Sequence, residues 1–326
     1  MKTRILSANE QSITTAAKLI KNGDLVAFPT ETVYGLGANA LDEQAVRKIF
    51  FAKNRPADNP LIVHVAELAT VSLLVKDIPV TAQALIDAFW PGPLSIVFLK
   101  SALVPKLTTA GLETVVIRFP SHPTAQALIK AAGTPIAAPS ANISGRVSPT
   151  TAKDVFRDLD TKIPLILDSE QITYGIESTV IDCTTPTPTL LRPGSITKEM
   201  IEEVVGAISD KPTKEVKSPG MKYRHYSPAT PLTLLTGSAE ERQRKYQEYT
   251  DRRNTSFSLI FHSIDHCHET AQRLSSQPKE AAVDLYSTLI KADAHQLSEI
   301  VVEGYEDDAQ GIAIMNRLRK AATIIK

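Results

Sequence analysis

The sequence predicts an α/β protein with two domains. Its 326 residues are about twice a typical domain of ~150 residues, and 43% of them are hydrophobic, enough to form a sizeable core. Patterns typical of helices alternate with short apolar runs on both sides of a segment that contains few large aliphatic residues. We therefore expect a first domain over residues 1–205, a linker over 206–230 and a second domain over 231–326.

In the first domain, Ser7-Ala-Asn-Glu10 predicts a capping box that starts a helix ending at Gly23. A strand follows at Leu25–Phe28, and Asp42 begins a second helix. Further helices are expected near 67–75, 81–90, 124–132 and 151–158, and strands near 61–65, 94–99, 114–119, 135–138, 164–167, 179–183 and 189–191. Tight connections between adjacent short strands favour a mixed sheet over a purely parallel one.

The second domain has the pattern of a small Rossmann-like domain, in which strands alternate with helices. Its strands are expected at 232–235, 258–261 and 299–302, and its helices near 239–249, 268–274, 280–291 and 309–323.

Composition excludes several classes of protein. Lys plus Arg equals Asp plus Glu, 36 against 36, so a bulk polycation that binds nucleic acid is excluded, although a local basic groove stays open. The two cysteines, Cys183 and Cys267, are too far apart for a CxxC site and too few for a disulfide framework. The sequence has no apolar run of ~18 residues and no signal-peptide pattern. We expect a cytoplasmic protein.

A histidine-rich stretch in the second domain resembles a metal cluster. It contains His262, His266 and His268 around Cys267, directly after a predicted strand. Helical spacing is not assured there, so we expect a polar loop that binds no metal.

One glycine pattern resembles a dinucleotide-binding turn. Gly35-Leu-Gly-Ala-Asn-Ala40 matches GxGxxA between a strand and a helix. Polar Thr30, Glu31 and Thr32 separate this pattern from the strand, whereas a dinucleotide turn leaves its strand directly. The pattern is therefore weak evidence, and Walker A is absent.

Cationic groups occur where predicted elements end. Lys53 and Arg55 either complement a helix dipole or, because Arg55 precedes Pro56 in a constrained turn, recognise phosphate or carboxylate. Arg118 ends an apolar strand and needs a partner or a ligand. His64 lies within another apolar strand, as either a core residue or a ligand-binding one.

Small polar groups follow other strands. Hydroxyl and amide groups lie between Ser140 and Ser148, and Ser178 and Arg192 lie near strand edges. Each group has an ordinary explanation as part of a turn. If they converge, the cavity suits a polyanion, such as a nucleoside triphosphate beside a carboxylate substrate. No nucleophile elbow or serine–histidine–acid spacing appears.

Five ordered motifs resemble the YrdC-like domain. They are Pro29-Thr-Glu-Thr-Val-Tyr-Gly-Leu36, Lys53-Asn-Arg55 with Asn59-Pro-Leu, Ser140-Ala-Asn142 with Ser144-Gly, Glu177-Ser-Thr-Val180 and Arg192-Pro-Gly194. The segment Ser218-Pro-Gly-Met-Lys-Tyr-Arg-His-Tyr-Ser-Pro228 and the tail resemble the two-domain threonylcarbamoyl-AMP synthase family. The resemblance implies a twisted mixed sheet with helices, followed by a Rossmann-like domain.

The resemblance also implies an activity. L-Threonine, bicarbonate and ATP, with Mg²⁺, would give threonylcarbamoyl-AMP and pyrophosphate by nucleotidyl transfer. The product would pass to the tRNA threonylcarbamoyl-transfer machinery for the t6A modification at adenosine 37, without stable binding of nucleic acid or membrane by this protein.

The resemblance implies three sets of site residues. The catalytic residues would be Lys53 and Arg55. Threonine would be bound by Thr32, His64, Arg118, Ala138 and Ser178. ATP would be bound by Arg55, Asn59, Thr114, Ser140, Ser148, Arg192 and Tyr226.

Two other functions share the YrdC-like domain. An RNA-binding module expects interleaved exposed aromatics, but aromatic residues are only 6% of the chain. A carbamoyl-transfer maturation factor needs acylphosphatase and zinc-finger segments, and two distant cysteines exclude the zinc fingers.

The linker has an unusual composition. The chain has no acidic residue from Val216 to Ala239, and the linker part of this stretch concentrates Lys222, Tyr223 and Arg224 ahead of Tyr226. We interpret it as a lid that closes over the nucleotide, with a solvated spacer as the alternative.

Overall fold

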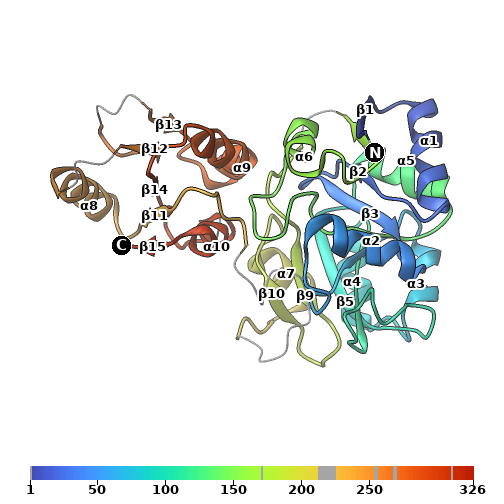
Figure 1. Ribbon diagram of the computed structural model, residues 1–326. Helices are drawn as coiled ribbons and strands as arrows, with labels where there is room; N and C mark the ends of the chain where they lie inside the picture. The colour runs from blue at the N-terminus through green and yellow to red at the C-terminus, as the bar shows by residue number, and fades with distance from the viewer. Residues whose placement is uncertain (1, 170–171, 212–224, 253–255, 267–269, 310) are drawn as a thin grey trace. The chain divides into compact units, whose positions relative to one another are not determined.

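The computed structural model describes residues 2–169, 172–211, 225–252, 256–266, 270–309 and 311–326 (Figure 1). These residues form two compact units. The first unit takes its described residues from 1–144, 148–173 and 177–222, and the second from 145–147, 174–176 and 223–326. Among the described residues, no helix is both long enough and apolar enough to cross a membrane.

The first unit contains a ten-stranded mixed sheet in the order β1-β8-β2-β3-β7-β4-β6-β5-β9-β10. Its strands are β1 (Arg4–Ser7), β2 (Val26–Phe28), β3 (Gly35–Asn39), β4 (Ile62–His64), β5 (Leu94–Leu99), β6 (Thr114–Arg118), β7 (Ile136–Ala137), β8 (Leu165–Asp168), β9 (Thr179–Asp182) and β10 (Thr189–Arg192). β4 and β6 pair in parallel, whereas β5 and β6 are antiparallel. The predicted mixed sheet is confirmed.

Helices cover the two faces of this sheet unequally. They are α1 (Glu10–Lys21), α2 (Glu43–Lys53), α3 (Leu68–Leu74), α4 (Val80–Phe89), α5 (Pro123–Ala132), α6 (Ala152–Leu159) and α7 (Lys198–Val205). One face packs in a core with α2, α3, α4, α6 and α7. On the other face, α1 and α5 lie side by side and pack on β1, β2, β7 and β8 (Figure 1).

The remainder of that second face carries a small apolar cluster made of strand residues alone. Its buried members are Ile62, Val97, Val116 and Val180, with Leu191 packed beside them. None of these described core residues belongs to a helix. The side chains that alternate with the helix-facing ones along β4, β5, β6 and β9 lie on this face, so a functional site could be built from them.

The second helix begins as the sequence predicts. The Asp42 side chain accepts hydrogen bonds from the backbone N–H groups of Gln44 and Ala45, which caps α2. The helix ends at Asn54, whose φ of 51° is left-handed and turns the chain sharply. This cap places Lys53 at the end of the helix and Arg55 in the loop that follows.

One local prediction in the first unit is wrong, and one pattern that the sequence analysis judged weak evidence proves to be a strand. The first helix is capped by Asn9, which forms a reciprocal box with Ser12, and the predicted cap Ser7 is instead the last residue of β1. The Gly35–Asn39 segment forms β3, antiparallel to β2, and not a dinucleotide turn. A Cβ atom at Gly37 would lie 2.7 Å from both Ile136 Cγ2 and Phe28 Cε1, so close packing explains this glycine.

The second unit contains a five-stranded parallel sheet in the order β13-β12-β14-β11-β15. Its elements are β11 (Leu232–Leu235), α8 (Ala239–Arg252), β12 (Phe257–Phe261), β13 (Gln272–Arg273), α9 (Pro278–Ala294), β14 (Glu299–Glu303), α10 (Gly311–Ala321) and β15 (Ile324–Ile325). The Rossmann-like prediction is confirmed. The helix expected near 268–274 is wrong, because Gln272–Arg273 pairs with β12 as an edge strand.

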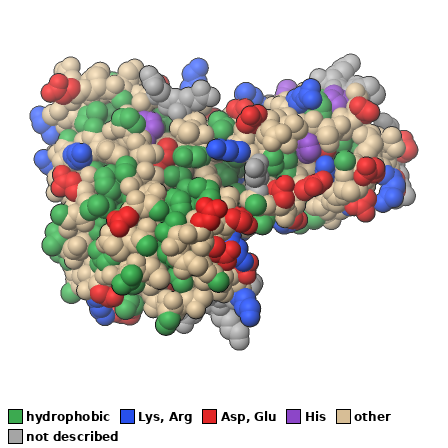
Figure 2. All heavy atoms as spheres, turned by 180° about the vertical axis from the view of Figure 1, so that it is seen from behind, with side chains coloured by type: hydrophobic (Ala, Val, Ile, Leu, Met, Phe, Trp, Pro, Cys, Tyr) green, Lys and Arg blue, Asp and Glu red, His purple; other side chains and the backbone are tan. Residues whose placement is uncertain are grey.

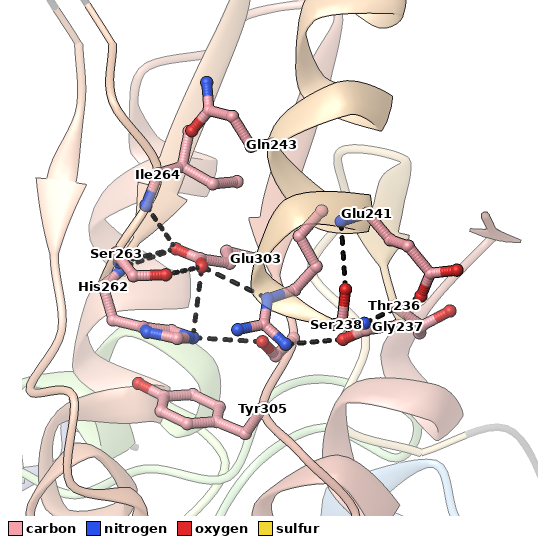
Figure 3. Close-up of polar contacts among 12 residues, drawn as sticks. Thr236, Gly237, Ser238, Glu241, Gln243, His262, Ser263, Ile264, Glu303 and Tyr305 are labelled. Carbon is pink, nitrogen blue, oxygen red and sulfur yellow. Dashed lines mark hydrogen bonds and ion pairs between the residues drawn. The ribbon is translucent and has the colours of Figure 1, made fainter.

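A buried polar cluster closes the carboxyl end of this second sheet (Figure 3). The Glu303 carboxylate accepts backbone N–H groups from His262 and Ser263 at 2.8 Å and from Ile264 at 3.1 Å. It also pairs with Arg242 Nε at 3.3 Å, while Tyr305 stacks on the His262 ring. The cluster thereby fixes the loop after β12 to the end of β14.

Burial raises the pKa of Glu303, but hydrogen bonds from Ser263 and His262 outweigh it and leave that pKa below its ordinary value. A carboxylate with a lowered pKa stabilises the fold above its ordinary pKa, and this stabilisation is lost as the pH falls through the lowered value.

Replacing this buried carboxylate is expected to destabilise the second unit strongly. Glu303→Ala leaves the Arg242 charge buried without its partner, which costs about 3–5 kcal/mol in free energy of unfolding. Asp307→Ala, which breaks an exposed pair with Arg319, is the matched control and should cost less than about 1 kcal/mol. Urea denaturation of the full chain measures both, and equal losses would contradict the prediction.

Candidate functional site

The site is built from polar side chains in one row on the face of the first sheet where the buried cluster of Ile62, Val97, Val116 and Val180 contains no helix residue. Strand register places His64 of β4 and Ser95 of β5 on either side of Arg118 of β6. Side chains of directly paired residues share one face of a sheet. All three residues are buried. The structure thus brings together two predicted threonine-binding residues, His64 and Arg118, from separate motifs.

Arg118 is held by groups from two loops. Its Nη1 donates to Thr32 Oγ1 at 2.9 Å, its Nη2 pairs with a Glu31 carboxylate oxygen at 2.8 Å, and its Nε donates to the Gly92 carbonyl at 3.4 Å. Glu31 and Thr32 lie in the connection between β2 and β3. This buried ion pair fixes the plane of the guanidinium and balances its charge.

Burial and the charge of Arg118 determine the ionisation of Glu31 and His64. Burial raises the pKa of Glu31, but the Arg118 charge and hydrogen bond outweigh this and lower that pKa, so Glu31 is ionised at neutral pH. Burial and then the Arg118 charge lower the pKa of His64 to about 3, which keeps its imidazole neutral. His64 Nδ1 is buried and has no hydrogen-bond partner in the described structure.

Ser178 and Arg192 meet beside this row. Arg192 donates to the Ser178 carbonyl at 3.0 Å and to its hydroxyl at 3.1 Å. The Ser178 hydroxyl lies 2.8 Å from that of Ser95, the register partner of Arg118. A predicted ATP-binding arginine and a predicted threonine-binding serine are therefore in contact.

Lys53 anchors a second part of the site. It is buried, and its Nζ donates to the backbone carbonyls of Ser140 and Asn142. Burial, and then the charge of Arg55, holds the pKa of Lys53 well below its ordinary value. The Ser140 hydroxyl donates to the Asn142 side chain at 2.6 Å, and a bridge joins Ser140 to Gly35 of β3. Lys53 therefore ties the end of α2 to this loop.

Arg55 and Asn59 lie in the loop after α2. Arg55 Nη2 donates to the carbonyls of Asn59 at 3.3 Å and Pro60 at 3.1 Å. The Asn59 side chain is only 1% exposed, and neither its amide nitrogen nor its amide oxygen has a partner in the described structure. A buried amide costs free energy unless its hydrogen bonds are made, so Asn59 is suited to a ligand.

Of the remaining predicted residues, Ser148 and Ala138 lie near residues already described, whereas Thr114 lies farther along its strand. The Ser148 hydroxyl donates to Glu177 at 2.6 Å, next to Ser178, and buried Ala138 directly follows β7. Thr114 begins β6 on the same face as Arg118, four residues or ~13 Å along the strand. No described contact joins Thr114 to the other predicted residues.

Tyr226 lies in the second unit. Its ring stacks on Tyr286 with centroids 5.8 Å apart, and the Arg317 guanidinium lies 5.7 Å from the ring centroid. Residues 212–224, which include most of the proposed lid, lie outside the described residues. The lid stays a prediction.

No group of three or more His, Cys, Asp or Glu side chains in the described part of the chain could hold a metal ion. Cys267 and His268 of the histidine-rich stretch lie outside it, and the prediction for that stretch remains untested.

Two residues of the site were not among those predicted. Glu31 lies within the motif that begins at Pro29, but the sequence does not show that it faces Arg118. Ser95 could have been noticed, because it is a lone hydroxyl in the apolar strand Leu94–Leu99.

Comparisons with known proteins agree with this geometry. A Sua5/YciO/YrdC family model, described as telomere recombination, matches residues 18–194. A second, described as the threonylcarbamoyl-AMP synthase C-terminal domain, matches residues 196–323. The threonylcarbamoyl-AMP synthase of Bacillus subtilis is 47% identical over 97% of this chain and 94% of its own. This chain belongs to the threonylcarbamoyl-AMP synthase family. The predicted resemblance is confirmed.

Other members of the threonylcarbamoyl-AMP synthase family give the same result. The Pyrococcus abyssi enzyme of this name is 45% identical over 96% of this chain and 94% of its own. A crystal structure of P. abyssi Sua5 complexed with L-threonine matches with a TM-score of 0.93 and 44% identity, covering 100% of this chain and 99% of that one.

The lowered pKa of His64 predicts how the stability of this protein depends on pH. The folded pKa of about 3 lies below the ordinary value of 6.5, so the unfolded chain binds more protons between these values and stability rises with pH. His64→Gln should remove on the order of 2 kcal/mol of the stability difference between pH 7 and pH 5. Urea denaturation at both pH values measures it.

The exposed His295 provides the control, because His295→Gln should retain the stability difference between the two pH values. A His64→Gln protein that loses stability as steeply as the parent would show that His64 does not resist protonation.

Proposed function

We propose that this protein is an L-threonylcarbamoyladenylate synthase, a nucleotidyltransferase that converts L-threonine, bicarbonate and ATP to threonylcarbamoyl-AMP and pyrophosphate. The observation that carries the proposal is the row of His64, Arg118 and Ser95 beside Ser178 and Arg192. In this arrangement the Arg118 guanidinium suits a carboxylate, the neutral side chains suit a hydroxyl group, and Arg192 suits a phosphate.

The proposed reaction needs no protein nucleophile. The threonine amine attacks the carbon of bicarbonate, a C–OH bond breaks and water leaves, which gives a carbamate. A carbamate oxygen then attacks the α-phosphorus of ATP. The bond from that phosphorus to the pyrophosphate oxygen breaks, and pyrophosphate leaves. Both reacting partners are anions, so positioning and charge neutralisation carry the rate enhancement.

Two regions divide this work in the proposal. Arg118, with Thr32 and His64, binds the amino acid, while Arg55 and Arg192 offset phosphate charge. Lys53 is buried under the loop of Ser140 and Asn142, so we assign it the positioning of that loop and not direct attack. The unpartnered amide of Asn59 is assigned to ATP.

Mg²⁺ is proposed to enter with ATP, because it binds substrate phosphates and retains water ligands more readily than it fills an all-protein cage. It would supply charge neutralisation for the leaving pyrophosphate.

The product would supply tRNA t6A modification in the cytoplasm. The RNA-binding alternative gains no support from the face in Figure 2, where acidic and basic side chains are interspersed on both units. A continuous basic surface, which sequence-independent RNA binding requires, is not seen on that face.

Substrate omission tests the proposal directly. With ATP, Mg²⁺ and bicarbonate, L-threonine should give an adenylate that carries a carbamoyl group, identified by mass, and omission of bicarbonate should abolish it. Serine should react less well, because one methyl group in an apolar pocket contributes only ~1–3 kcal/mol. Pyrophosphate release that needs no amino acid would overturn the proposal.

The role of Arg55 makes a second test. Arg55→Ala should reduce threonine-dependent pyrophosphate release far more than Arg55→Lys, and Lys should restore only part of the activity because it lacks the planar fork. Arg47→Ala, on the exposed side of α2, is the control. Equal activity in the parent and both Arg55 variants would reduce Arg55 to a structural charge at the helix end.

A further inference from the structure

The Glu31 carboxylate is a buried acid that the proposed reaction does not use. It is 3% exposed and lies in the connection between β2 and β3. Arg118 pairs with it at 2.8 Å, and no other side-chain donor in the described part of the chain reaches its oxygens. An ionised carboxylate offers about four acceptor positions. Arg118 and the backbone N–H groups of Glu31 and Ser121 address this one, which leaves about one position for a further donor.

We propose that Glu31 recognises the ammonium group of the amino-acid substrate while Arg118 binds its carboxylate. Glu31 is then the residue that selects an α-amino acid over an amine-free acid. This inference rests on the proposed function, because it assumes that threonine binds at Arg118.

Geometry supports this assignment. In an α-amino acid the ammonium nitrogen and the carboxylate carbon are attached to one carbon atom. A carboxylate held by Arg118 therefore brings the ammonium close to the same guanidinium, and Glu31 is the acid in contact with it. The Thr32 hydroxyl, which accepts from Arg118 and lies 2.9 Å from that of Thr30, closes the same corner of the site.

The balance of charge gives an independent argument. Glu31 and Arg118 together are neutral, and a zwitterionic amino acid adds one charge of each sign. An amine-free acid would instead place two carboxylates on one buried guanidinium, and like charges in a buried site repel strongly. His64 cannot offset this excess, because burial and Arg118 hold its pKa at about 3.

A simpler role for Glu31 is to hold Arg118 in place. That role predicts that any ligand of Arg118 weakens by the same factor when the acid is neutralised. Recognition of the ammonium predicts a loss confined to ligands that carry an amine. The ratio of two affinities therefore separates the two roles.

The test compares L-threonine with (R)-3-hydroxybutyrate, which retains the carboxylate, hydroxyl and methyl groups but lacks the amine. Binding of each to the full chain is measured by calorimetry without ATP or bicarbonate. The parent should prefer threonine by at least about 30-fold, because a site built for a substrate N–H group rejects the analogue without it. A parent that binds the two compounds within threefold of each other overturns the inference, even if no variant folds.

The decisive variant is Glu31→Gln, which retains the shape and removes the charge. It should bind threonine about 10- to 100-fold more weakly, as expected for a lost hydrogen bond to a charged group, and should bind (R)-3-hydroxybutyrate as well as the parent or better. A variant that weakens both compounds equally, and so keeps the preference, overturns the inference.

Asp24→Asn is the matched control, since it removes a carboxylate paired at 2.8 Å with Lys48 on the surface of the same unit. It should leave both affinities unchanged. If the parent binds neither compound and releases no pyrophosphate with threonine, the proposed function is overturned as well. If the parent releases pyrophosphate with threonine but the Glu31→Gln variant still prefers threonine to (R)-3-hydroxybutyrate by the same factor, this inference alone is overturned.

Discussion

A guanidinium buried in a protein needs its charge balanced and its donors occupied, and the first unit is organised around meeting that need at Arg118. The charge comes from Glu31 and hydrogen-bond acceptors from Thr32 and Gly92, which lie in two different connections. These connections must therefore close over the end of β6 for the ion pair to form. The lowered pKa of His64 follows partly from the same charge.

The second buried cation meets the same need in another way. Lys53 donates to two backbone carbonyls, those of Ser140 and Asn142. A flexible ammonium can reach several carbonyls, whereas the planar guanidinium of Arg118 suits a carboxylate. Burial, and then the charge of Arg55, holds the pKa of Lys53 well below its ordinary value, and the opposing charge of Asp158 does not outweigh them.

The sequence predicts most of what depends on neighbours along the chain. The Asp42 cap, the strand Leu94–Leu99 and the mixed sheet follow from local pattern, and so does the placing of polar groups at strand ends. Local sequence pattern does not predict contacts between segments that are distant along the chain. The pairing of Glu31 with Arg118 joins residues 87 positions apart, and Gly37 is explained only by Phe28 and Ile136 packed against it. Tertiary packing also turned Gln272–Arg273 into an edge strand.

The alternation along β6 has a consequence for how the chain reaches its native pairing. Val116 and Arg118 face the site, while Val115 and Ile117 face the helix-covered core. A slip of one residue against β4 or β5 would drive the arginine into apolar packing and turn isoleucine toward the polar row. Misregistered intermediates would thus carry an uncompensated buried charge, so Arg118 also favours the native register of the sheet.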